Sequence, residues 1–418
     1  MEKADLEQHI REQVNYWTQD FHDRQIWIPM IEELVNPIIL GDHKSFVWED
    51  LDHPQNIQLK DHYNLKEIVK ESSNDFDALC RLMHWIYSQW KHSPTKNPSR
   101  FDALTILEEA QKGGQFVCAA YACVFIQCCT ALGFPARGLG SSGLGFNYIG
   151  GHFQTEAWSN KYRKWILFDP TNDIIYFKDE IPQNAAELVH QTELNRMKDV
   201  RMQVIDPEFD WIQFNDADPR GYFHSVSLDM HNLFFVEPYE QAFKKHPRWI
   251  WLDEGVVRAF PLEATRPANY TSDATKVYFT VNQAFIQPVL EQDWNAVKST
   301  DAPKIKLLIS NTMPWFSHYL VEVNGNRIEV KDESCVVEFA ENMLRATVFP
   351  VNKRGRRGIP AILSITLKRY PFLERTKPAE IIQMLSMLIS ACEEYGLRDC
   401  AAKCQAKKMK YETIIDGS

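Results

Sequence analysis

The sequence predicts an α+β protein: a cysteine-bearing helix packed on an antiparallel sheet, then an all-β sandwich and a helical tail. Three observations support this prediction. An apolar helical pattern over residues 116–132 is followed by strand-like runs up to residue 177. Short runs rich in β-branched and aromatic residues fill residues 276–370. Leucine, methionine and isoleucine then recur at helical spacing over residues 377–410.

The first clear helix pattern lies over residues 75–93, where apolar side chains recur at steps of three and four. Asn74 or Asp75 can cap its start, and Pro94 ends it. A second, short helix follows Asp102 and is broken by two consecutive glycines. These two helices precede the cysteine-bearing helix and are expected to pack beside it.

The helix over residues 116–132 is apolar nearly all round, which is typical of a buried helix. Gly133 ends it. The glycine-rich stretch 138–151 predicts a flexible loop. Two strands, His152–Trp158 and Lys164–Asp169, are expected to form a hairpin.

Composition and turn signals divide the chain into four predicted parts. Residues 1–60 are expected to pack on the core as an N-terminal segment, and residues 61–262 to form the main α+β domain. Residues 268–372 should form an immunoglobulin-like β-sandwich, in which Asn324-Gly325 makes a hairpin turn. Residues 376–418 should form the helical tail.

Charge and composition exclude several classes of function. The net charge of −10 argues against a nucleic-acid-binding protein. The basic run 353–357 lies between strand-like segments and is interpreted as an exposed hairpin loop. The N-terminus lacks a secretory signal pattern, and no apolar run is long enough to cross a membrane. We therefore expect a cytoplasmic chain with reduced cysteines and no membrane partner; the oligomeric state is not predicted.

Three residues in this order favour nucleophilic catalysis. Cys118 lies in the first turn of a helix, where the helix dipole lowers a thiol pKa. His152 begins a strand after two glycines and could hold the thiol proton. Asp169 ends the next strand, at the same end of the predicted hairpin, and could orient the imidazole. We therefore predict a catalytic Cys118–His152–Asp169 site.

An acyl-transfer site also needs donors for the developing oxyanion. The backbone N–H of Cys118 can supply one, and either the Gln115 amide or the Trp90 indole could supply a second. The other cysteines of this helix have no such partners and are interpreted as core residues. No set of residues has the spacing of a metal site, so no metal and no cofactor are predicted.

Several short segments, in order, carry a family resemblance. They are residues 114–122, 131–137, 151–156 and 165–172, including Trp165 and Phe168-Asp169-Pro170. Together they resemble the core of the transglutaminase-like superfamily, including its bacterial members. The resemblance covers roughly residues 70–180 and implies a papain-like Cys-His-Asp triad, whose positions match Cys118, His152 and Asp169. The chain differs from the family pattern at Phe116, which replaces a glycine, and at Gln154, which replaces an aromatic residue.

Three functions are compatible with this pattern. The first is a cysteine-dependent hydrolase of amides, such as a peptidase, a deamidase or an enzyme similar to peptide N-glycanase. The second is an acyltransferase that passes the same acyl group to a lysine amine. The third is a binding or scaffold protein that kept the fold without turnover. Hydrolysis is favoured because nothing in the chain resembles the calcium-binding domains of large animal transglutaminases, and the expected substrate is a protein, peptide or glycopeptide.

Overall fold

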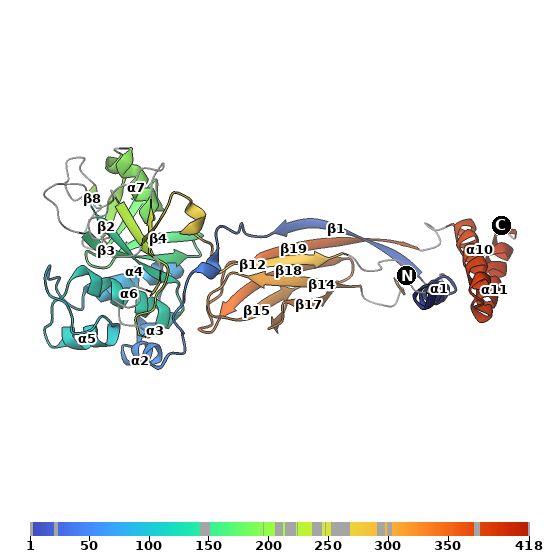
Figure 1. Cartoon of the computed structure of the whole chain (residues 1–418), viewed down its shortest axis with the longest axis horizontal. Coiled ribbons are helices and arrows are strands. Elements are labelled where there is room, and N and C mark those ends of the chain that lie inside the picture. The colour runs from blue at the N-terminus through green and yellow to red at the C-terminus, as the bar shows by residue number, and fades with distance from the viewer. Residues whose placement is uncertain are drawn as a thin grey trace.

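A computed structural model describes residues 3–20, 24–142, 151–194, 196–204, 212–213, 223, 225–235, 245–246, 248–251, 268–290, 297–298, 303–371 and 377–416. Figure 1 shows an elongated molecule in which a mixed helix and sheet core, a β-sandwich and a helical bundle follow one another. The predicted α+β class with a sandwich and a helical C-terminal part is confirmed. Within the described residues, no helix is both long and apolar enough to span a membrane.

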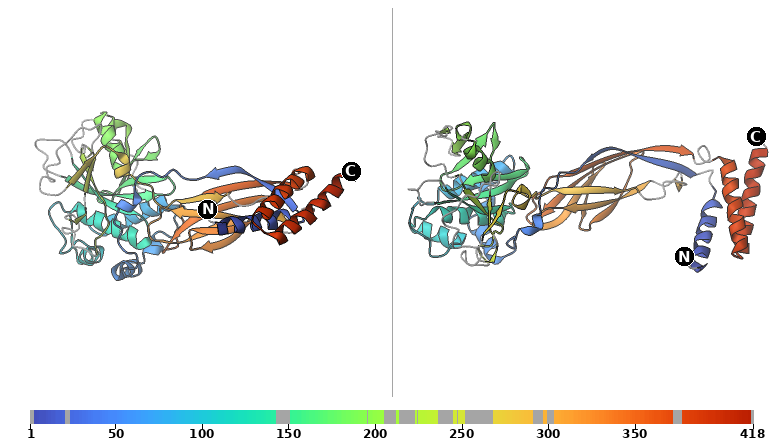
Figure 2. Two further views of the ribbon diagram at one scale, coloured as in Figure 1. Left: turned by 45° about the vertical axis from the view of Figure 1, so that its right-hand side comes forward. Right: turned by 45° about the horizontal axis from the view of Figure 1, so that its top comes forward.

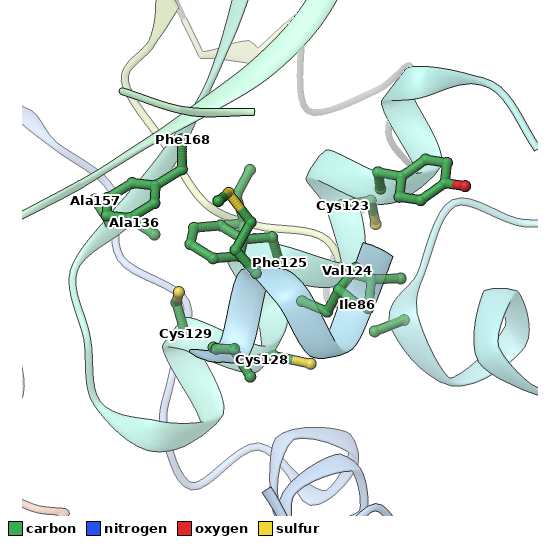
Figure 3. Close-up of a cluster of buried hydrophobic side chains, with 14 of the residues drawn as sticks. Ile86, Cys123, Val124, Phe125, Cys128, Cys129, Ala136, Ala157 and Phe168 are labelled. Atoms are coloured by element: carbon green, nitrogen blue, oxygen red, sulfur yellow. The ribbon is translucent and has the colours of Figure 1, made fainter. Parts of the chain in front are cut away.

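Four helices of the core lie around one buried helix, α6 (Cys118–Leu132). The four are α2 (Pro54–His62), α3 (Leu65–Ile68), α4 (Asp75–Tyr87) and α5 (Ala103–Gln111). The Asn74 side chain caps α4 and the Asp102 side chain caps α5 by accepting backbone N–H bonds, as the sequence predicts. Every residue of α6 from Ala120 onward is buried, and Gly133 ends the helix with φ of 77°. Figure 3 shows side chains of α6 together with Ile86 of α4 and with side chains of the neighbouring sheet.

A long sheet lies against α6. Its strands, in spatial order, are β11 (Ala268–Thr271), β10 (Arg248–Trp251), β9 (Ser225–Asp229), β2 (Ala136–Ser142), β3 (Gly151–Ser159), β4 (Lys164–Asp169), β5 (Ile174–Lys178), β7 (Arg201–Val204) and β8 (Ile212–Gln213), with β6 (Ile181–Pro182) beside β5. Helix α7 (Ala185–Glu193) follows β6. Strands β2, β3 and β4 pair antiparallel, and α6 contacts β2 and β3. The predicted hairpin of β3 and β4 is therefore present.

Part of the predicted glycine-rich loop is regular structure. Residues 136–142 form β2, while residues 143–150 lie outside the described residues. The predicted border between the core and the sandwich, near residues 262–268, lies largely outside them as well, since residues 252–267 are not described.

The sandwich contains two packed sheets. One has the order β13 (Val297–Lys298), β1 (Arg24–Val35), β19 (Ala361–Pro371), β18 (Met343–Asn352), β15 (Phe316–Val323) and β16 (Asn326–Val330). The other contains β12 (Ala284–Val289), β14 (Lys304–Asn311) and β17 (Ser334–Glu338). Asn324 and Gly325 both adopt positive φ, which makes the predicted turn between β15 and β16. Alternate side chains of both sheets fill a common core.

The prediction that residues 1–60 pack on the core is wrong for the first half of that segment. Helix α1 (Lys3–Trp17) packs against α10 (Pro378–Glu394) and α11 (Arg398–Asp416), where Ile10 and Val14 are buried. Strand β1 pairs with β19 along its length, so it belongs to the sandwich. The right view of Figure 2 shows α1 beside the C-terminal helices, at the end of the molecule far from the core. Ile10 and Val14 of α1 thus complete the apolar cluster of the last two helices, and β1 occupies the edge of β19 opposite β18.

The basic run forms the predicted hairpin loop, between β18 and β19, but two of its arginines are half-buried against the core. The Nε of Arg354 donates to the Ala131 carbonyl at 3.1 Å, and the Nε of Arg356 donates to the Leu132 carbonyl at 2.5 Å. Asn352 donates to the Gly133 carbonyl at 2.9 Å. These carbonyls end α6 and have no partner within the helix. The run therefore caps the negative end of α6 and fixes the sandwich to the core.

Candidate active site

Cys118 begins α6 at the end that faces the sheet. The preceding residue, Val117, is extended and provides no side-chain cap, so Cys118 lies directly at the positive end of the helix dipole. The Val117 N–H donates to the Lys96 carbonyl at 2.9 Å, which holds the approach to the helix in place. The backbone N–H of Phe153 donates to the Cys118 sulfur at 3.4 Å. The thiol of α6 is thus in direct contact with strand β3.

His152 and Asp169 lie at the same end of the β3–β4 hairpin, as the sequence predicts. The Nε2 atom of His152 lies 2.9 Å from Oδ2 of Asp169. The His152 side chain is 11% exposed and the Asp169 side chain only 1%, so the carboxylate is shielded from water while the ring remains accessible. Since Nε2 contacts the carboxylate, Nδ1 is the ring nitrogen left for the Cys118 thiol. The structure therefore brings the three predicted side chains together.

Three further groups hold the Asp169 carboxylate, and sequence reasoning missed all of them. The Gln154 amide donates to Oδ2 at 3.2 Å, and the Asn172 amide donates to the same atom at 2.8 Å. The Thr171 N–H donates to Oδ1 at 3.1 Å. Gln154 lies two residues after His152, on the same face of β3, so strand periodicity could have identified it. The difference from the family pattern at Gln154 thus supplies a partner for the carboxylate.

The pKa values of the three groups favour an ion pair. Burial raises the pKa of Cys118, but the hydrogen bond and positive charge of His152 and the Phe153 N–H outweigh it, so the pKa lies below its ordinary value. Burial lowers the pKa of His152, but the charge and hydrogen bond of Asp169, with the contribution of Cys118, raise it to about 10. Burial also opposes ionisation of Asp169, and His152, Asn172 and Gln154 together hold its pKa below the usual range. A thiolate–imidazolium pair is therefore favoured between these pKa values.

The other cysteines of α6 show the opposite behaviour. Cys123, Cys128 and Cys129 are completely buried in the apolar cluster of Figure 3. Burial raises the pKa of each of these thiols above the ordinary value. They are core residues, as predicted. Among the described residues, no three His, Cys, Asp or Glu side chains are grouped so that they could hold a metal ion.

The two predicted oxyanion donors differ in their surroundings. The Trp90 ring packs 4.3 Å from the ring of Tyr121, which lies three residues after Cys118 on α6. The Trp90 indole N–H is buried and has no acceptor among the described residues. Gln115, in contrast, is an exposed residue before the buried Phe116. A buried donor without an acceptor costs free energy in the resting protein, and an oxyanion in the site would supply the missing acceptor. Trp90 is therefore the better candidate for the second oxyanion donor.

His92 is a further side chain of this region that the sequence did not indicate. It lies in the segment before Cys118 that pairs with Phe116, and its pKa responds to His152 and Asp169. A single histidine in a proline-rich loop carries no recognisable pattern, so only the folded structure brings it to the site.

Comparison with protein families identifies the fold of this region. Residues 64–170 match the model of the transglutaminase-like superfamily. The chain contains a transglutaminase-like core. The matched segment includes Cys118, His152 and Asp169, and it runs from the start of α3 to the end of β4. The predicted resemblance, made over roughly residues 70–180, is confirmed.

Two solved structures are similar to this chain at low identity. A structure described as a "Putative Cysteine Protease from Cytophaga hutchinsonii" is 16% identical and has a TM-score of 0.23; the match covers 36% of this chain and 67% of that one. Red sea bream transglutaminase is 8% identical, also with a TM-score of 0.23, over 86% of this chain. The chain spans 63% of the length of that enzyme. No curated protein matches the sequence.

Proposed function

We propose that the chain is a thiol-dependent enzyme that hydrolyses amide bonds of a protein, peptide or glycopeptide through an acyl-enzyme on Cys118. The observation that supports this most strongly is the contact of His152 with both Asp169 and the Cys118 thiol, together with the Phe153 N–H bond to the sulfur. This arrangement lowers the thiol pKa at a partly exposed cysteine, whereas the buried cysteines of the same helix have raised pKa values.

In the proposed mechanism, the Cys118 thiolate attacks the amide carbonyl carbon. The first-turn N–H of Cys118 and the Trp90 indole N–H donate to the resulting oxyanion. The His152 imidazolium gives its proton to the leaving nitrogen, the C–N bond breaks, and a thioester remains. His152, now neutral, takes a proton from the incoming water as water attacks the thioester. The C–S bond then breaks and restores the thiolate and the imidazolium.

Transfer to an amine would follow the same steps up to the thioester. Hydrolysis requires only that water reaches the thioester, and the His152 ring that would activate this water is itself 11% exposed. Transfer requires in addition a site that binds an amine and excludes water. Hydrolysis is therefore the simpler proposal. Comparing acid and amine-adduct products across glutamine, asparagine-glycan and peptide substrates distinguishes the two.

Selective alkylation tests the proposed nucleophile. At about pH 6, limiting iodoacetamide should label Cys118 at least about ten times faster than Cys335, because each unit of thiol pKa changes the thiolate fraction tenfold. Cys335 is the matched control, since it is also partly exposed and burial raises its pKa. Peptide mapping of the labelled chain measures both rates. Equal rates would contradict the proposal and favour a scaffold protein that kept the fold.

Trp90→Phe tests the oxyanion donor. Acylation of Cys118 by para-nitrophenyl acetate should slow by about a hundredfold, because that step forms an oxyanion and the variant lacks the indole N–H. Alkylation by iodoacetamide should be unchanged, because displacement at a saturated carbon forms no oxyanion. An equal loss in both reactions would show that Trp90 supports the site only through packing.

A further inference from the structure

The backbone at His92 runs beside the entry to α6. His92 forms a parallel bridge with Phe116, two residues before Cys118. The N–H of Ser93 donates to the Phe116 carbonyl at 3.0 Å. With the bond from Val117 to Lys96, these contacts attach residues 92–96 to the chain that leads into the nucleophile. The segment that carries His92 is thus held at the site by two hydrogen bonds to the peptide unit that joins Phe116 to Val117.

The His92 side chain lies over the helix face that carries Cys118. Its ring centroid is 6.4 Å from that of Tyr121, which follows Cys118 by three residues and so shares its face of α6. The Tyr121 hydroxyl donates to the Trp90 carbonyl at 2.8 Å, which fixes the tyrosine ring. His92 is nevertheless an exposed residue. A supported yet exposed imidazole beside the nucleophile is positioned to meet an incoming substrate.

The charges around His92 keep it in a different state from His152. Burial and then the positive charge of His152 lower the pKa of His92, while Asp169 acts in the opposite direction. These two groups come from β3 and β4; from α6 the ring faces Tyr121, and its own segment contributes Lys91 and Lys96. The site therefore contains two imidazoles at neutral pH, a cationic one that contacts the thiol and a neutral one at the entrance.

We propose that His92 is a specificity-determining residue of this site, which contacts the substrate beside the scissile amide and disfavours positively charged substrate groups when it is protonated. This inference rests on the proposed function, since it requires Cys118 to be the reacting group. The neutral ring can donate or accept a hydrogen bond to an uncharged substrate chain. Its cationic form places a second positive charge beside His152 and favours acidic substrates instead.

A pair of small reagents tests the proposal without a known substrate. Cys118 alkylation is measured with anionic iodoacetate and neutral iodoacetamide between about pH 5 and about pH 8. Both attack the same thiolate, so the ratio of their rates cancels the thiolate fraction and reports local charge. As pH falls and His92 takes a proton, the ratio should rise by on the order of threefold. In His92→Gln, which keeps hydrogen-bonding groups but cannot titrate, the ratio should not vary with pH.

His62→Gln is the matched control, because His62 is also exposed and packs edge-on against the neighbouring Tyr63 at a ring distance of 4.7 Å. That variant should keep the wild-type dependence of the ratio on pH. An unchanged dependence in His92→Gln would overturn the role of His92 while leaving the nucleophile intact. Labelling of Cys118 no faster than Cys335 with either reagent would overturn the proposed function, and the role of His92 with it.

Discussion

Replacing His152 with alanine is expected to slow acylation of Cys118 by para-nitrophenyl acetate at about pH 6 by roughly a thousandfold. The variant loses the hydrogen bond and positive charge that hold the Cys118 pKa below its ordinary value. Burial is then unopposed except by the Phe153 N–H, so the thiol pKa should rise. Wild type should already react at about pH 6, because the protonated His152 stabilises the thiolate. Loss of the His152 proton near its pKa of about 10 should stop the cleavage of amides, whose leaving nitrogen needs that proton, but not acylation by the ester. The variant should react only at alkaline pH.

His84→Ala provides a matched control for this result. His84 also contacts a buried carboxylate, with Nδ1 at 2.7 Å from Oδ2 of Asp173, but it belongs to α4 and not to the group of Cys118, His152 and Asp169. Its removal should leave the pH dependence of Cys118 acylation unchanged. If acylation of Cys118 in His152→Ala keeps the wild-type pH profile, His152 is not the partner of the thiol.

The local part of the site was predictable because each element carries its own signal. Helix α6 could be predicted from its apolar composition and its terminal glycine, and the strands that carry His152 and Asp169 from their β-branched and aromatic runs. A short turn between two strands then forces His152 and Asp169 to one end of the hairpin. These steps need only neighbouring residues, which is why a single sequence was sufficient.

Long-range contacts explain what the sequence did not reveal. Nothing local in residues 24–35 indicates that they pair with residues 362–371 rather than with the core. The basic run looks like a solvated loop until the carbonyls of Ala131 and Leu132 are placed beside it. Gln154 appeared only as a difference from the family pattern, and its role became clear once Asp169 was placed on the neighbouring strand. In each case the deciding partner is distant in sequence.

Replacing Arg137 with methionine is expected to lower the free energy of unfolding by about 3–5 kcal/mol. Arg137 on β2 lies directly opposite Glu156 on β3, and its Nη2 is 2.7 Å from Oε2 of that carboxylate, with both side chains completely buried. The guanidinium also donates to the Val277 carbonyl and stacks on Trp165. The variant leaves the Glu156 charge buried with only neutral partners, the Ala185 N–H and the Tyr278 hydroxyl. Urea unfolding followed by tryptophan fluorescence measures the change.

Two further variants separate the cost of an unpaired charge from the cost of altered packing. Lys70→Met removes an ion pair with Glu67 in which both side chains are more than half exposed, and should change stability by no more than about 1 kcal/mol. The double variant Arg137→Met, Glu156→Leu removes both buried charges and should recover much of the loss. A double variant no more stable than Arg137→Met alone would show that the stacking of Arg137 on Trp165, and not its charge, stabilises this region. Ser141 of β2 pairs with His152 of β3, so loss of this pairing would also disturb the site. In Arg137→Met, alkylation of Cys118 should therefore slow only at temperatures where the variant begins to unfold.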